Sequence, residues 1–236
     1  MARRSEGGPA LTTTEVRASV EAFVAAAARA ERAGFDGVEV HGAHGYLVAQ
    51  FLDGRNNHRD DGYGGSAADR ARFLHEVLDG IRQSTGSDFQ VGLRLSPERF
   101  GIDLGEATEL AGELMAGGRI DYLDLSLWDV RKRPHGRDDD GLLLEHFSTL
   151  PRHGVRLGYA GQVLSAADVD WCLAHAADFV SVGTGAIIHH DFAHRVVSDP
   201  SFVSEPQPVT REHLAGESVG PAFVEYLATN WDDFVR

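Results

Sequence analysis

Two histidines and a tyrosine stand close together early in the 236-residue chain. The segment reads His41-Gly-Ala-His44-Gly-Tyr46, and it follows a short apolar run at 35–40. Two imidazoles can donate hydrogen bonds to one carbonyl oxygen and stabilise the negative charge that develops there. A phenol two residues further along can act as a proton donor. We therefore expect His41, His44 and Tyr46 to converge on one small-molecule ligand.

The same histidines leave a second hypothesis open. His-x-x-His with Glu39 nearby is also typical of zinc or manganese sites. Glu39 and His41 share one face only if the strand continues through both, and the loop contains no acidic residue that would complete a cluster. We therefore predict no metal ligands, and a metal-dependent barrel hydrolase is the weaker alternative.

An arginine within an apolar run is the next candidate. Arg94 lies in the segment 89–95, which is otherwise rich in apolar residues. A buried charge without a partner is very costly, so this side chain either faces a cavity or forms an ion pair. The structural explanation is an ion pair with Glu39 or Asp124, and the functional explanation is a place beside a ligand.

The elements that position these residues alternate along the chain. Helices are expected at 12–33, 43–52, 67–85, 104–116 and from Ser165, and a helical turn or two at 142–150. Thr14 is the expected N-cap of the first helix, and Gly34 is expected to follow its end. Buried strands are expected at 35–40, 89–95, 122–127, 155–159 and 179–182. Such alternation predicts a parallel sheet covered by helices. The pattern alone fits both a doubly wound sheet and part of a (β/α)8 barrel.

Composition narrows the function classes. The formal net charge of −14 argues against a nucleic-acid partner or an anionic membrane surface. No apolar run reaches the roughly 20 residues of a membrane span, and no secretory signal is recognisable, so we expect a cytoplasmic protein. The single cysteine, Cys172, is expected to be a buried small hydrophobe. The length predicts one domain over 1–236, with a flexible N-terminus at 1–11 and a C-terminal extension at 200–236.

Three stretches resemble the signature of the Old Yellow Enzyme family. They are 34–47 followed by Gln50-Phe51-Leu52, then Asn57-x-Arg59-x-Asp61-x-Tyr63-Gly-Gly-Ser with Arg70-x-Arg72-Phe73, and Val91-Gly-Leu-Arg94-Leu-Ser-Pro97. The similarity covers roughly 11–199. It implies a (β/α)8 barrel that binds FMN non-covalently and passes a hydride from NADH or NADPH, through the flavin, to an activated alkene.

The resemblance also implies roles for individual residues. His41 and His44 would hold the electron-withdrawing oxygen of the substrate, and Tyr46 would donate a proton or orient the substrate. Arg94 would lie beside the flavin ring. Phosphate binding is expected in the loops after the last two strands. The residues assigned there to the cofactor are Gly161, Gln162, Gly183 and Thr184. The polar stretch 57–72 is expected to be architectural, with a charge network of Asp61, Arg70 and Arg72.

Two departures from the family pattern bear on these expectations. Thr184 stands where the family typically has an arginine that pairs with the phosphate, so FMN affinity should fall unless His189, His190 or Arg195 compensates. About ten residues precede the first helix, where the family has three further strands. The sequence is therefore interpreted as about five C-terminal βα units of a partial barrel.

Such a partial barrel would expose sheet edges and part of its apolar interior. Two partner hypotheses follow, a homo-oligomer and a complementing N-terminal chain. The alternative function is a catalytically silent barrel fragment that acts by assembling with another chain.

Overall fold

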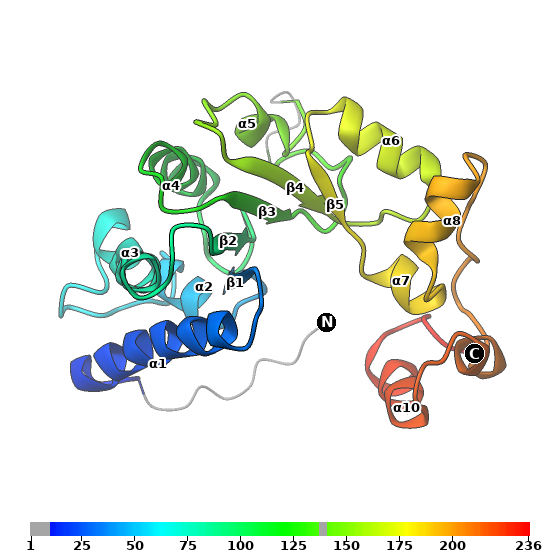
Figure 1. Cartoon of the computed structure of the whole chain (residues 1–236), viewed down its shortest axis with the longest axis horizontal. Helices are drawn as coiled ribbons and strands as arrows, with labels where there is room; N and C mark the ends of the chain where they lie inside the picture. Colours follow the sequence, from blue (N-terminus) through cyan, green and yellow to red (C-terminus); the bar gives the residue numbers. More distant parts are fainter. Residues whose placement is uncertain (1–9, 137–140) are drawn as a thin grey trace. The chain divides into compact units, whose positions relative to one another are not determined.

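The structure, a computed structural model, describes residues 10–136 and 141–236 (Figure 1). The strands are β1 (Gly37–Gly42), β2 (Gln90–Leu95), β3 (Tyr122–Ser126), β4 (Arg156–Ala160) and β5 (Phe179–Ser181). The helices are α1 (Thr13–Arg32), α2 (Leu47–Leu52), α3 (Ala67–Ser84), α4 (Leu104–Ala116), α5 (Glu145–Ser148), α6 (Ala166–Ala174), α7 (Thr184–Ile188), α8 (Phe192–Ser198), α9 (Arg211–Gly216) and α10 (Pro221–Asn230). Most of the N-terminus predicted to be flexible, 1–9, lies outside the described residues.

The sheet has five strands in the order β1-β2-β3-β4-β5. β1 pairs with β2 in parallel from Gly37 opposite Gln90 to Gly42 opposite Leu95. β4 pairs with β5 in parallel as well. The chain divides into two compact units: the first holds the described residues up to Leu123 with 150–155, and the second holds 124–149 and 156–236. The prediction of one domain stays a prediction.

Helix α1 begins one residue after Thr12 because Thr12 forms a capping box with Glu15. The Glu15 amide donates to the Thr12 hydroxyl at 3.2 Å, and the Thr12 amide donates to the Glu15 carboxylate at 2.7 Å. The prediction that Thr14 is the N-cap was therefore wrong, since the T-x-x-E pattern starts two residues earlier. Gly34 follows the helix with φ +87°, as expected of a residue at this position.

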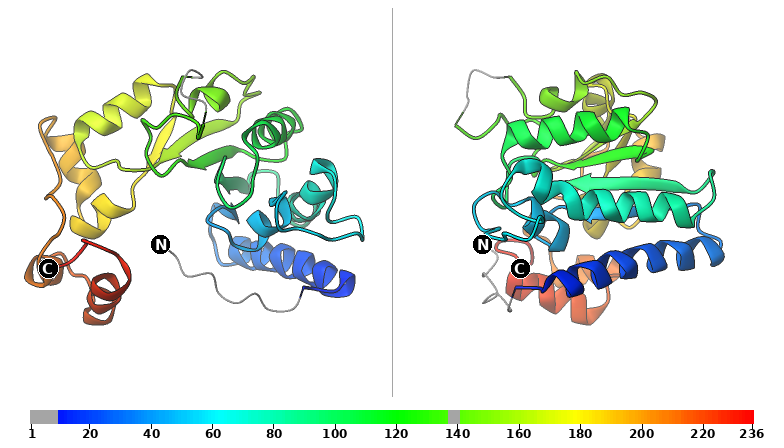
Figure 2. Two further views of the ribbon diagram at one scale, coloured as in Figure 1. Left: turned by 180° about the vertical axis from the view of Figure 1, so that it is seen from behind. Right: turned by 90° about the vertical axis from the view of Figure 1, so that its left-hand side faces the viewer.

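The core of the first unit forms where α1, α2 and α3 meet. Phe73 of α3 is fully buried; its ring contacts Phe23 of α1 edge-on at 6.0 Å and stacks on Phe51 of α2 at 4.4 Å, measured between centroids. The helices α1 and α3 lie side by side (Figure 2). Gly80 permits their close approach, because a Cβ there would lie 2.5 Å from a Val24 methyl carbon.

The segment between α2 and α3 is held by ion pairs other than the predicted network. Arg59 binds Asp61, whose carboxylate also accepts a hydrogen bond from Thr13 at 2.5 Å. Arg70 pairs with Glu106 of α4. Arg72 pairs with Asp69, three residues before it on the same helix. The expected network of Asp61, Arg70 and Arg72 was therefore wrong, because each of these residues forms its ion pair with a residue outside the predicted network.

The second unit contains β4, β5 and the C-terminal helices. A small apolar core joins α7, α9 and α10, and its buried members are Ile188, Val209, Leu214, Val224, Leu227 and Phe234. Cys172 of α6 is fully buried, as predicted, and burial raises the pKa of its thiol to about 11. No helix within the described ranges is both long enough and apolar enough to cross a membrane.

The structure shifts two predicted boundaries that matter for the site. β1 begins at Gly37 and extends through His41 to Gly42, whereas the strand was predicted at 35–40. α2 begins at Leu47, whereas its start was predicted at Ala43. Two of the residues between β1 and α2, His44 and Gly45, have positive φ, which an α-helix does not accommodate.

We expect Thr12→Ala to lower the free energy of unfolding by about 1 kcal/mol, because the first turn of α1 loses its capping side chain. Urea unfolding of the purified variant measures the change. Thr14→Ala is the matched control, since Thr14 is exposed and lies two residues inside the helix. A larger loss in the control than in Thr12→Ala would contradict the assigned cap.

Candidate active site

His41 occupies the carboxyl end of β1, directly opposite Arg94 of β2. Side chains of paired residues in a parallel ladder project from the same face of the sheet. Both side chains are half-buried, in strands that are otherwise largely apolar. The register therefore sets an imidazole beside a guanidinium at the end of the sheet where ligands bind in parallel α/β folds.

The loop that follows β1 turns sharply at His44. His44 has φ +59° and Gly45 has φ +75°, both in the left-handed region. The His44 amide donates to the hydroxyl of Ser96, which is buried just beyond β2, at 3.1 Å. Tyr46 closes the turn, since its amide donates to the Ala43 carbonyl at 3.3 Å, and it serves as the N-cap of α2.

The turn brings the three predicted side chains together. The ring centroids of His41 and His44 are 5.0 Å apart, with 47° between the ring planes. The ring centroids of His41 and Tyr46 are 5.4 Å apart. Tyr46 is 62% exposed, so its phenol is accessible to a ligand. The three rings thus lie close together at the carboxyl end of β1.

Both imidazoles are held in the neutral form. Burial, and then the positive charge of Arg94, lower the pKa of His41. The same two causes, with a further contribution from His41, lower the pKa of His44 to about 4. A neutral imidazole carries one N–H donor and one acceptor nitrogen. The pair can therefore donate hydrogen bonds to a substrate oxygen at neutral pH.

A cavity of about 420 Å³ opens beside this loop. Its lining comes from the turn, from α2 and the segment that follows it, and from the segment after β2; the lining residues are Gly45, Ala49, Gln50, Asp53, Arg55, Asn56, Phe100 and Gly101. Gly45 is required here, because a Cβ at that position would approach the Phe100 ring to 2.9 Å. The first unit therefore offers space for a small molecule next to the histidine turn.

The four residues predicted for the phosphate end lie after β4 and after β5, in the second unit. Gly161 and Gln162 follow β4, with φ +149° and +52°. A Cβ on Gly161 would lie 2.7 Å from the backbone of Trp128 and Asp129, so packing between loops by itself requires this glycine. Gly183 is exposed, a Cβ there would meet nothing, and Thr184 begins α7. Gly183 thus leaves its backbone open to a ligand.

Glu217, which the sequence did not single out, binds two of the residues that were candidates to compensate for Thr184 at the phosphate. The backbone amide of His190 donates to the Glu217 carboxylate at 2.9 Å, and the Nδ1 atom of the His190 ring lies 2.6 Å from the same oxygen. An Arg195 nitrogen lies 3.5 Å from the same carboxylate and another lies 2.6 Å from Asp191. His190 and Arg195 therefore each lie against a carboxylate.

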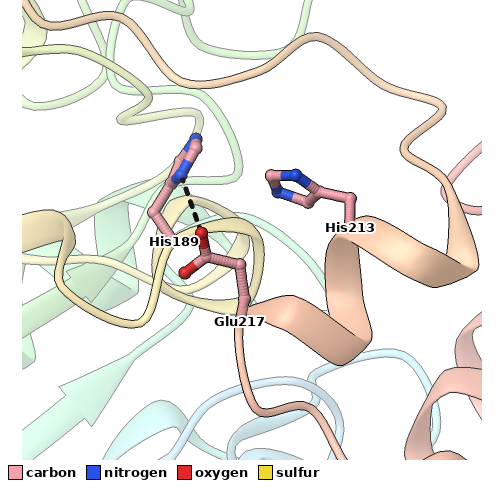
Figure 3. Close-up of side chains that lie close together, drawn as sticks. All are labelled: His189, His213 and Glu217. Atoms are coloured by element: carbon pink, nitrogen blue, oxygen red, sulfur yellow. Dashed lines mark ion pairs between the residues drawn. The ribbon is translucent and has the colours of Figure 1, made fainter.

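Glu217 also lies near two further histidines, in a group whose composition resembles a metal site (Figure 3). The His189 Nδ1 is 3.8 Å from a Glu217 oxygen, and His213 donates from Nε2 to the Ile188 carbonyl at 2.8 Å. However, the Glu205 amide donates to Nε2 of His189 at 3.0 Å. A neutral His189 therefore keeps its proton on Nδ1, the nitrogen that a metal would need. This group holds α9 to the segment after α7 rather than an ion.

Neither set of metal-capable side chains found in the described ranges includes His41 or His44. The two sets are His189-His213-Glu217 and His190-Asp191-Glu217. The zinc or manganese alternative for the histidine turn accordingly gains no support from the structure.

Comparison with known proteins adds a family model and close relatives. Residues 5–144 match the model of the NADH:flavin oxidoreductase / NADH oxidase family. An NADPH dehydrogenase of Clostridium acetobutylicum is 51% identical over 151 residues, which are 62% of this chain and 40% of the relative. A probable flavin mononucleotide-dependent alkene reductase of Leishmania infantum is 34% identical over 204 residues, 85% of this chain and 54% of the relative.

Solved structures agree with these relatives. Morphinone reductase in complex with tetrahydroNAD superimposes with a TM-score of 0.69 at 35% identity, over 87% of this chain and 54% of that one. The match and the strand order confirm the predicted α/β fold, a partial (β/α)8 barrel. The chain spans about half the length, or less, of the curated relatives it matches.

We expect the chain to lose stability as the pH falls from about 6.5 to about 4. The unfolded chain takes up a proton at His44 near its ordinary pKa of 6.5, whereas the folded chain does so only near 4. Protonation in this window therefore favours the unfolded state, and the stability present above it is lost. Asparagine tolerates positive φ and does not titrate, so His44→Asn should lose less stability over the same window. Urea unfolding at a series of pH values measures both proteins.

His153→Asn is the matched control, because His153 also has positive φ, at +51°, but is exposed. Its pH dependence should equal that of the unaltered chain. If His44→Asn showed the same acid loss as the unaltered chain, the neutral, half-buried state of His44 would be wrong.

Proposed function

The chain belongs to the NADH:flavin oxidoreductase / NADH oxidase family, and from this premise we propose that it is an FMN-dependent oxidoreductase of the Old Yellow Enzyme type. The proposed reaction passes a hydride from NADH or NADPH, through flavin, to an activated alkene. One observation carries the proposal: two neutral imidazoles meet beside Arg94 at the carboxyl end of β1. The activity, substrates and partners of the whole protein are proposals, because the relatives extend well beyond this chain.

The residues of each unit, taken by itself, offer chemical groups that suit one part of an FMN molecule. Arg94 offers a fixed positive charge that would favour the anionic reduced flavin ring. Gly183 leaves an open backbone for the phosphate, and Thr184 and Gln162 offer a hydroxyl and an amide. With His190 and Arg195 bound to carboxylates, phosphate binding within the second unit would depend on neutral donors. Such bonds are weaker than charge-assisted ones, so we propose a modest phosphate contribution to affinity.

The chain's own residues would prepare the substrate. The imidazole N–H groups of His41 and His44 would donate to the electron-withdrawing oxygen of the alkene substrate and polarise its double bond. Tyr46 would hold the proton on its phenolic oxygen until it is given to the substrate carbon. The bound flavin would supply the hydride. Burial, and then the charge of Arg94, would keep the imidazoles neutral, so that they act as hydrogen-bond donors to the substrate oxygen.

The alternative functions are less well supported. A metal-dependent hydrolase would need ligands that the histidine turn does not bring together among the described residues. A catalytically silent chain that assembles with another polypeptide predicts no flavin binding by the purified protein, so the flavin titration below separates it from the enzyme. The homo-oligomer, the complementing N-terminal chain and the cytoplasmic location remain predictions from the sequence.

We expect the purified chain to bind FMN and Arg94→Met to weaken that binding at least tenfold. A hydrogen bond to a charged group contributes about 1.5–3 kcal/mol, which corresponds to a factor of ten or more. Quenching of FMN fluorescence on titration with protein measures the affinity. Arg72→Met is the control, because Arg72 is an exposed arginine paired with Asp69. An absence of FMN binding by the unaltered chain would refute the cofactor proposal.

We expect the double variant His41→Ala with His44→Ala to abolish binding of 4-hydroxybenzaldehyde in the FMN-loaded chain. The phenolic oxygen of this ligand would take the place of the substrate oxygen between the two imidazoles. Isothermal titration calorimetry measures the binding. His194→Ala, which removes an exposed imidazole of α8, should bind the ligand like the unaltered chain. Unchanged affinity in the double variant would show that the pair does not hold the ligand.

A further inference from the structure

The backbone of His44 adopts a conformation that a residue with a side chain rarely takes. Its φ of +59° is in the left-handed region, where the Cβ lies too close to the carbonyl oxygen. A residue other than glycine remains there only when its surroundings hold it. If His44 returned to an ordinary φ, its ring would leave the position 5.0 Å from His41.

Ser96 supplies one such restraint. Its side chain is 2% exposed, and its hydroxyl oxygen accepts the His44 amide hydrogen at 3.1 Å. The pairing of β1 with β2 ends with Gly42 opposite Leu95, so Ser96 is the first residue after β2. Where the backbone hydrogen bonds between β1 and β2 end, the Ser96 hydroxyl provides the next hydrogen bond between the two segments.

The other contacts of the turn act on later residues. The Tyr46 amide bonds to the Ala43 carbonyl, and the Gln50 amide group bonds to the Gly45 carbonyl. Gly45 packs against Phe100. These contacts shape the exit of the turn, whereas the bond to Ser96 acts on His44 itself.

Ser96 also lies two residues after Arg94 in the sequence, directly after the end of β2. The cation beside the imidazoles and the anchor of the turn therefore come from one short stretch of backbone. Movement of the turn relative to this stretch would change the distance between the His44 ring and Arg94.

We propose that Ser96 is a positioning residue, which holds the His44 backbone in the left-handed turn and thereby directs the His44 ring at the ligand oxygen beside His41. The ligand part of this inference rests on the proposed function. The geometric part, that Ser96 fixes the His44 ring, is independent of it.

The test is a titration of the histidine rings by NMR in the unaltered chain and in Ser96→Ala. In the unaltered chain the His44 pKa is expected near 4, since the ring is half-buried beside Arg94 and His41. In Ser96→Ala the ring should leave this environment, and its pKa should rise toward 6.5. Ser96→Cys, which keeps the volume but is a weak acceptor, should raise it in the same direction and serves if Ser96→Ala does not fold.

Ser66→Ala is the matched control. Ser66 also accepts a backbone amide hydrogen, from Asp69 at 3.2 Å, but it caps α3 away from the turn. This variant should lose stability and leave the His44 pKa unchanged. A His44 pKa that stayed near 4 in both Ser96 variants would overturn the positioning role.

The second readout is affinity for 4-hydroxybenzaldehyde in the FMN-loaded protein, measured by calorimetry. We expect Ser96→Ala to weaken binding about tenfold, since the His44 donor would no longer meet the ligand oxygen. Equal affinity in the unaltered chain and Ser96→Ala would overturn the directing role. If the unaltered chain binds neither FMN nor the phenol, the proposed function fails, and the NMR titration still decides whether Ser96 fixes the ring.

Discussion

The register of β1 on β2 is the constraint on which the candidate site depends. It sets His41 opposite Arg94, where burial, and then the guanidinium charge, lower the pKa of both imidazoles. Because the strands are parallel, their carboxyl ends lie at the same edge, and the turn that carries His44 starts beside the end of β2. A slip of one residue would turn every side chain of β1 to the opposite face and remove His41 from the site.

Histidines in the two units show how surroundings decide what an imidazole does. His41 and His44 lie beside a cation, and the turn that carries them contains no acidic residue. His190 is bound by Glu217, and Nε2 of His189 accepts a hydrogen bond from the Glu205 backbone. The rings of His190 and His189 thus bind a carboxylate and a backbone amide of the second unit, whereas the rings of His41 and His44 lie against each other beside Arg94. Residue type alone did not distinguish them.

Much of the fold was predictable from hydrophobic periodicity. The bounds of α4 were predicted without error, and those of α3 to within one residue, because each has a clear apolar stripe and a capping residue before it. The end of β1 was missed, since the polar His41 does not extend an apolar pattern although the ladder continues through it. Glu217 was missed because its histidine partner lies 27 residues away, and no local signal connects them. Ser96 was visible only as part of the motif around Arg94, and its bond spans 52 residues.

The burial of Cys172 has a practical consequence. The chain has no other cysteine, and at neutral pH a thiol with a pKa near 11 is almost entirely in its unreactive protonated form. A cysteine introduced at an exposed position would then be the one thiol able to react quickly with a maleimide. A fluorophore or spin label can therefore be attached at a chosen point in this chain without first removing the native cysteine.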